Sequence, residues 1–191
     1  LFDALGNAVD QTQVTKVYDA AAAALVEVSK RVIHNTSYDN RGDAAAQTIA
    51  SYLVDFPDGS RLDTLVSYQE FTNRVYDSSH NITNQMILTY DKAGTGRILL
   101  DVQESRSIGF HSSGVALTQI IATYSDITKL SLLDVKVIVN SGISSQGNVG
   151  MSVITKYSGC SIADDGAGAI TPTDEIDRQT ITTTAFDVRG N

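Results

Sequence analysis

Two runs of alternating aliphatic residues between residues 130 and 159 constrain the fold of this chain most strongly. The first run alternates Leu133, Val135, Val137 and Val139 with Asp134, Lys136 and Ile138, and the second alternates Val149, Met151 and Val153 with Gly150, Ser152 and Ile154. A period of two directs one set of side chains to one face of a strand. A polar loop separates the runs, so we expect a β-hairpin with one face that can be buried.

Three further segments have strand character. Residues 62–76 are rich in β-forming residues. Residues 81–103 predict a second hairpin, because apolar residues share one parity on either side of the turn DKAGTG. The run QTITTTAFDV near the end alternates Thr180, Thr182, Thr184, Phe186 and Val188 with Ile181 and Thr183, which predicts a last strand.

The first third of the sequence instead predicts helices. In residues 14–33 apolar side chains recur at steps of three and four, the spacing of an amphipathic helix. A second helix is expected over residues 44–56 with Asp43 as its N-cap, and a short one over residues 113–125. The expected fold class is therefore α+β: a helical N-terminal segment, 1–60, followed by an antiparallel, jelly-roll-like β-sandwich domain, 61–191, in one compact unit. We find no internal repeat with a period of 20 to 50 residues.

The net charge and the cysteine count limit the classes of partner and of covalent cross-link that the chain can have. The 191 residues carry a formal net charge of −8, so no global field attracts nucleic acid or an anionic membrane, and a nucleic-acid contact would depend on local basic residues. Cys160 is the single cysteine, which excludes an intrachain disulfide. No apolar run reaches the ~20 residues of a membrane-spanning helix. The chain begins at Leu1 rather than Met, which suggests a trimmed product.

Candidate catalytic groups are few, and no short catalytic or phosphate-binding motif occurs in the sequence. His34, His80 and His111 could act as bases, and the run FHSSG places hydroxyls directly after His111. Sequence adjacency does not establish the hydrogen-bond geometry that a nucleophile and its base need. We expect a protein that is not an enzyme and has no cofactor.

Charged residues suggest two weaker hypotheses. Residues 159–177, expected to be a long loop, carry Asp164, Asp165, Asp174, Glu175 and Asp177, whose carboxylates could bind calcium, although solvated loop charge is the preferred account of them. Basic residues do not cluster: Lys30 and Arg31 are the one adjacent pair, and Arg74, Arg97 and Arg106 are dispersed.

Residues 95–159 resemble the shell domain of small icosahedral RNA-virus coat proteins. The resemblance consists of a short helix ending in an Ala-x-Tyr turn, a strand, a polar Gly loop and a second strand. The matching residues are Ile121, Ala122, Tyr124, Leu133, Val135, Val137, Ser144, Ser145, Gly147, Val149, Met151 and Val153. The basic arm of that family is absent here. The resemblance implies a jelly roll that builds a shell from copies of itself.

The expected function is therefore that of a self-assembling structural protein, a viral capsid or other virion component located in the virion. The alternative is an extracellular β-sandwich binding module that recognises carbohydrate or protein through its loops.

Overall fold

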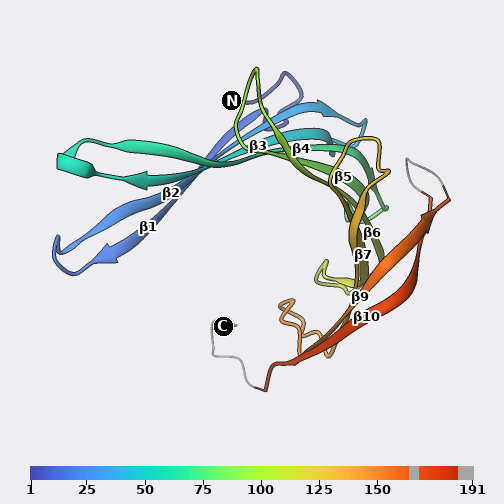
Figure 1. Ribbon diagram of the computed structural model, residues 1–191. Coiled ribbons are helices and arrows are strands. Elements are labelled where there is room, and N and C mark those ends of the chain that lie inside the picture. The colour runs from blue at the N-terminus through green and yellow to red at the C-terminus, as the bar shows by residue number, and fades with distance from the viewer. Residues whose placement is uncertain (164–167, 185–191) are drawn as a thin grey trace. The chain divides into compact units, whose positions relative to one another are not determined.

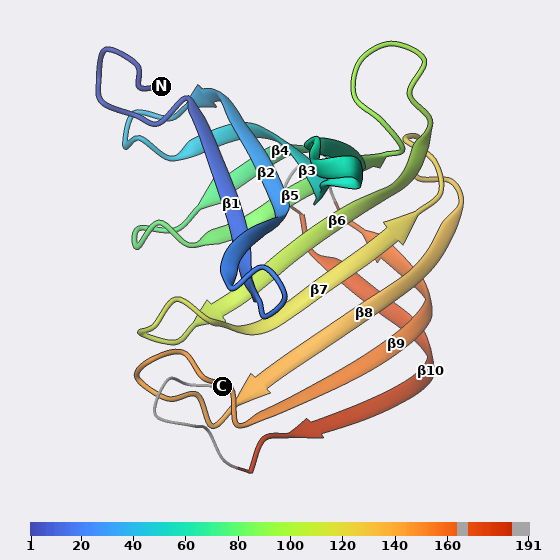
Figure 2. The same ribbon diagram turned by 90° about the vertical axis from the view of Figure 1, so that its left-hand side faces the viewer.

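The chain folds into strands that pair in the order in which they occur in the sequence. A computed structural model describes residues 1–163 and 168–184, and its ten strands form one antiparallel sheet of order β1 to β10 (Figures 1 and 2). The strands are β1 (Asp10–Asp19), β2 (Ala24–Tyr38), β3 (Ala44–Asp55), β4 (Leu62–Tyr76), β5 (Ile82–Tyr90), β6 (Leu99–Phe110), β7 (Ala116–Tyr124), β8 (Leu132–Ser141), β9 (Met151–Ile162) and β10 (Ile170–Thr182). A single 3-10 turn, Pro57–Gly59, is the one helical element of the described residues.

The α+β class is wrong, because all three predicted helices are strands. The segment 14–33 forms β1 and β2, the segment 44–56 forms β3, and the segment 113–125 contains β7. The jelly-roll sandwich is also wrong: a jelly roll is a double sheet built from Greek keys, whereas here each strand pairs with its neighbours in sequence.

The alanine run at residues 20–24 explains the first error. Alanine favours a helix, but residues 20–23 make a turn in which the Asp19 carboxylate accepts hydrogen bonds from the backbone N–H groups of Ala21 (2.8 Å) and Ala22 (3.3 Å). The flanking segments are rich in valine and threonine, which favour strands. Valines that match a helical spacing in β2, such as Val28 and Val32, also match the strand period of two.

The strand predictions are confirmed where the sequence alternates clearly. β8 and β9 form the expected hairpin, with Val137 opposite Thr155 and Val139 opposite Val153. β4 covers residues 62–76, and β5 and β6 follow one another as expected. The expected loop 159–177 is mostly strand, because β9 continues to Ile162 and β10 begins at Ile170. The predicted last strand coincides with β10 only as far as Thr182, and Phe186 and Val188 lie outside the described residues.

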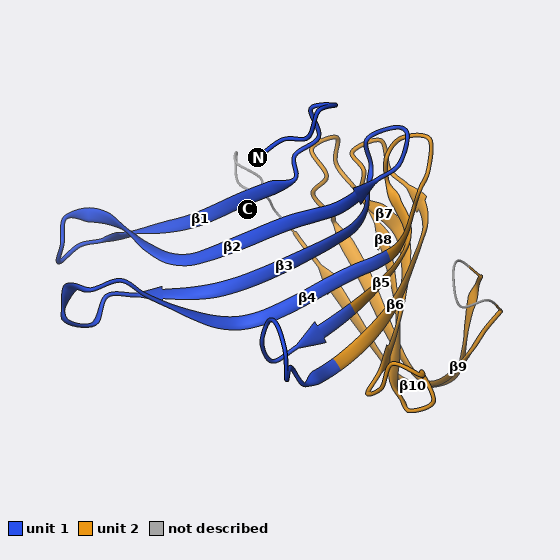
Figure 3. Cartoon of the chain, turned by 90° about the horizontal axis from the view of Figure 1, so that it is seen from above, with its two compact units in different colours: residues 1–72, 88–100 blue, residues 73–87, 101–191 orange. Residues whose placement is uncertain are grey.

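Two compact units share the strands, as the colours of Figure 3 show. Unit 1 comprises Leu1–Thr72 and Leu88–Leu100, and unit 2 comprises Asn73–Ile87 and Asp101–Asn191. This division does not test whether residues 61–191 fold on their own, so the domain boundary near residue 60 stays a prediction.

One five-residue turn recurs along the chain, about every 35 residues. Its first residue donates its N–H to the carbonyl of the fifth, and its fourth donates to the carbonyl of the first. The copies are Asp3–Asn7, Asp39–Asp43, Asp77–Asn81, His111–Val115 and Ser144–Asn148. The last four join β2 to β3, β4 to β5, β6 to β7 and β8 to β9, so each repeat is one hairpin plus one turn.

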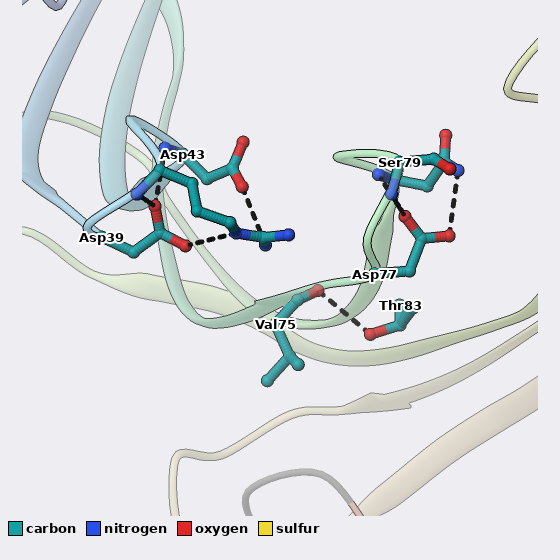
Figure 4. A network of polar contacts seen from close by, with 8 residues as sticks. Asp39, Asp43, Val75, Asp77, Ser79 and Thr83 are labelled. Atoms are coloured by element: carbon teal, nitrogen blue, oxygen red, sulfur yellow. Dashed lines mark hydrogen bonds and ion pairs between the residues drawn. The ribbon is translucent and has the colours of Figure 1, made fainter.

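The side chain of the first residue caps each of these turns. The Oδ1 atom of Asp39 accepts hydrogen bonds from the N–H groups of Arg41 (2.8 Å) and Asp43 (2.9 Å), and that of Asp77 accepts from Ser79 (2.8 Å) and Asn81 (3.0 Å) (Figure 4). The fourth residue has a positive φ in every copy: Gly6, Gly42, His80, Gly114 and Gly147. Glycine adopts this conformation without strain, which explains its use at four of the five sites.

The repeat escaped the sequence analysis because it is short and irregular. Its signature is an aromatic residue and Asp followed, after two residues, by Gly and Asn or Asp, as in FDALGN at 2–7 and YDNRGD at 38–43. His111 and Ser144 replace the aspartate in later copies, and His80 replaces one glycine. The same letters occur in FDVRGN at 186–191, which lies outside the described residues. Asp43 is consequently the last residue of a turn rather than the predicted helix N-cap.

Unit 1 buries a mixed aliphatic and polar core. Ile33 lies opposite Ile49 across β2 and β3, and both are buried, as are Val54, Leu88 and Tyr90. A second group surrounds a cation: the Arg97 guanidinium lies 3.9 Å from the centroid of the Tyr90 ring and 2.5 Å from Glu70 Oε1.

Unit 2 buries an ionic cluster in its core. Glu104 is completely buried, and its carboxylate contacts Arg106 Nη1 at 2.9 Å and Lys129 Nζ at 2.6 Å. Across the sheet Glu104 lies opposite Ala122, which in turn lies opposite Val135, so an apolar row flanks the charges. A carboxylate in such surroundings is stable only while its cations remain paired with it.

Acid should weaken the loop between β7 and β8. Hydrogen bonds from the Thr128 hydroxyl, and then from the N–H groups of Ser131 and Leu130, lower the pKa of Asp126 from 3.8 to about 2. Because the folded state has the lower pKa, this stabilisation is complete above 3.8 and is lost as pH falls through about 2. NMR titration of the Asp126 carboxyl carbon should give a midpoint near 2, and Thr128→Val should move it upward. A midpoint near 3.8 in the unaltered protein would contradict this account of the loop.

Loss of the buried carboxylate should destabilise the fold strongly. Glu104→Gln leaves Arg106 and Lys129 without their anion, so urea unfolding should show a loss of about 3–5 kcal/mol. Glu175→Gln is the matched control, because Glu175 contacts Arg178 at 2.9 Å on the exposed surface of the same unit. That change should cost about 1 kcal/mol or less. Equal losses for the two variants would show that the buried cluster is not a main source of stability.

Candidate functional site

Strand β1 presents an open sheet edge in unit 1. It pairs with β2 on one side, and no other described strand pairs with it. All but its last residue are exposed, including Val14, Val17 and Tyr18. The irregular pairing near Thr15 leaves Val28 as the extra residue on β2, so β1 itself is continuous. Leu1 occupies the backbone N–H and carbonyl of Asp10, and the regular strand beyond Asp10 is a template for another strand.

Strand β10 in unit 2 is an edge of a different kind. It contains Pro172, which has no N–H to donate, and Asp174, whose φ is +61°. Its pairing with β9 shifts between Glu175 and Asp177, which leaves Ile176 as an extra residue on the edge itself. Proline, a bulge and charged side chains are devices that block edge pairing. The described part of β10 is thus protected over its first half, whereas β1 is not.

Unit 2 also contains a polar groove of about 690 Å³ where two of the repeated turns lie near each other. One wall is formed by the Asp77 turn and the start of β5. The other wall is formed by the end of β6 and the His111 turn. The lining residues are Asp77, Ser79, Asn81, Thr83, Ser107, Gly109, Phe110, His111, Ser112, Ser113 and Gly114. A second hollow of about 400 Å³ shares Asn81, Ser107, Phe110 and Gly114 with the groove.

Both titratable groups that line the groove are engaged in their own turns. Besides its two backbone hydrogen bonds, the Asp77 carboxylate accepts one from Asn81 Nδ2 at 3.0 Å. His111 Nδ1 lies 2.8 Å from Ser113 Oγ and accepts the Ser113 N–H at 3.2 Å. Because a backbone N–H can only donate, Nδ1 is the acceptor, and a neutral His111 carries its proton on Nε2.

His111 Nδ1 and Ser113 Oγ are as close as a catalytic base and its nucleophile, but the recurring turn accounts for this contact without catalysis. Asp3, Asp39, Asp77 and Ser144 occupy the position of His111 in their turns, and their side chains also accept backbone N–H groups. The imidazole is therefore a turn cap that replaces a carboxylate. Its hydrogen bond to Ser113 does not require a catalytic role.

The other two histidines lie in different units. His80 is the fourth residue of the Asp77 turn, has φ +64°, and lines the second hollow. His34 lies in β2 of unit 1, with Nδ1 2.6 Å from Asp10 Oδ1 on the exposed surface. The fold thus brings His80 and His111 to adjoining hollows of unit 2, whereas His34 is in the other unit.

The acidic residues considered for calcium do not make a site within the described chain. Asp174, Glu175 and Asp177 follow one another along β10, and Asp164 and Asp165 lie outside the described residues. Over residues 1–163 and 168–184, no group of three or more potential ligand side chains could hold a metal ion.

Basic side chains are mostly paired with carboxylates. Lys30 contacts Asp63, Arg97 contacts Glu70 and Arg106 contacts Glu104. Lys30 and Arg31 are successive residues of a strand rather than of a helix end, so their side chains point to opposite faces of the sheet. Burial lowers the pKa of Arg74 from its usual value. A local nucleic-acid contact stays a prediction.

Cys160 is half-buried, with Sγ 3.6 Å from the hydroxyl oxygen of Tyr124. Among the described residues, no helix is long and apolar enough to cross a membrane.

Sequence reasoning missed the groove and the open edge. Ser107 and Phe110 were not candidates, because nothing local in the sequence shows that the end of β6 lies beside the Asp77 turn. The repeated Asp-x-x-Gly signature could have predicted the positions of the turns. The two turns that border this groove depart from the signature, because His80 replaces the glycine in one and His111 replaces the aspartate in the other. Comparison with known proteins finds no match to a family model, to a curated protein or to a solved structure.

Proposed function

We propose that this protein is a non-enzymatic structural protein that associates with copies of itself by pairing their β1 edges. The observation that carries the proposal is the contrast between the two edge strands. β1 is continuous and exposed, whereas β10 carries Pro172 and a bulge at Ile176. A continuous edge on one side of the sheet, with the other edge interrupted by a proline and a bulge, favours a closed pair of subunits over an open filament.

The sequence of β1 supports pairing with itself. In an antiparallel pair related by a two-fold axis at Gln13, the pairing extends over residues 11–15 of each copy, because Leu1 already occupies the backbone N–H and carbonyl of Asp10. The symmetry supplies each contact of the pair twice. Thr12 and Val14 then face each other beside the axis, and both suit a strand.

Sedimentation should detect this association and its disruption. The unaltered protein should sediment as a concentration-dependent dimer. Val14→Lys brings the new cations of the two copies to diagonal positions across the axis, about 7–8 Å apart, and should weaken dimerisation at least about tenfold. Val139→Lys is the matched control, because Val139 is 43% exposed and Val14 is 41% exposed, but Val139 lies on the interior strand β8. The control should dimerise normally.

A cysteine cross-link tests the register. In a Cys160→Ser background, Gln13→Cys should form an intermolecular disulfide on oxidation, because residues at the axis of an antiparallel pair are close enough to be bridged. Gln179→Cys on the β10 edge should not. A monomer at all concentrations, or cross-linking through position 179 alone, would contradict the proposal. The virion location and the coat-protein resemblance stay untested predictions, and β1 pairing does not depend on them.

A further inference from the structure

We propose that the groove between the Asp77 and His111 turns binds a neutral oligosaccharide. This site is separate from the β1 edge, so the proposal is independent of self-association. The volume of about 690 Å³ lies within the range of small-molecule sites, and the adjoining hollow of about 400 Å³ extends it beyond a single sugar ring.

The lining chemistry points to a neutral polyhydroxylated ligand. Ser79, Ser107 and Ser112 contribute hydroxyls, which both donate and accept hydrogen bonds, as sugar hydroxyls do. Neither lysine nor arginine is among the lining residues, and the Asp77 carboxylate repels anions. An anionic polymer therefore does not suit the groove.

The imidazole supplies a directed donor. Because His111 Nδ1 accepts hydrogen bonds from its own turn, the neutral ring has its N–H at Nε2 for a ligand oxygen. The half-buried ring of Phe110 adds an apolar surface beside these polar groups. An aromatic ring beside several hydrogen-bonding groups matches a sugar, which has polar hydroxyls and apolar C–H faces.

The turns hold these groups in place before a ligand arrives. Asp77 binds the N–H groups of Ser79 and Asn81, and the Thr83 hydroxyl donates to the carbonyl of Val75 at 3.1 Å (Figure 4). On the other wall, a Cβ added at Gly114 would lie 3.4 Å from Asn81 Oδ1, so the two turns are in close contact. Groups that are already ordered lose little entropy on binding.

NMR titration of the full chain tests the site. The probes are maltotetraose, cellotetraose and chitotetraose, with a heparin tetrasaccharide as the anionic comparison. At least one neutral probe should shift amide resonances of residues 77–83 and 107–114. Ser112→Trp fills the groove from an exposed position and should weaken that binding at least about tenfold.

The repeat provides the matched control. Ser145 is the second residue of the Ser144 turn, as Ser112 is of the His111 turn, and it is also exposed but does not line the groove. Ser145→Trp should leave the affinity within about twofold. The proposal is overturned if no neutral probe shifts these residues, if only the heparin fragment binds, or if the two tryptophan variants behave alike.

Discussion

The hydrogen bonds inside one recurring turn determine how this chain is organised. A side chain at the first position accepts backbone N–H groups, and a residue with positive φ at the fourth position lets the chain reverse. Each turn fixes the register of the strands that it joins, because a slip of one residue would move every side chain to the opposite face. These turns therefore support the pairing of β2 with β3, β4 with β5, β6 with β7 and β8 with β9.

The sequence predicted the strands best where apolar and polar residues alternate and no helical spacing is also present, as in β8 and β9. It failed where alanine dominated, because the period of three or four over residues 14–33 was compatible with a helix and with two strands. Pairing decided between them: in β2, Lys30 faces Val14 on one side and Tyr52 on the other. No local signal reports such contacts. The groove was missed for the same reason, since its walls are formed by turns that lie far apart in the sequence.

The buried core of the molecule differs from the surfaces that we propose for interaction. The buried ionic cluster around Glu104 needs closed packing, and it lies where β6, β7 and β8 are covered by neighbours on both sides. The β1 edge and the groove are instead surfaces whose backbone is fixed by hydrogen bonds but whose outward groups are exposed. In His111, Nδ1 accepts a hydrogen bond inside its own turn, and this bond leaves the ring proton of the neutral imidazole on Nε2. This division agrees with the proposed association and ligand binding.

Cross-strand proton contacts measured by NMR test the central claim most directly. If capped turns impose pairing in sequence order, Ile120 of β7 should show contacts with Arg106 of β6 and with Val137 of β8, and residues 14–33 should show strand rather than helical contacts. Contacts between β7 and a strand that is not its neighbour in the sequence, or helical contacts over residues 14–33, would contradict the account.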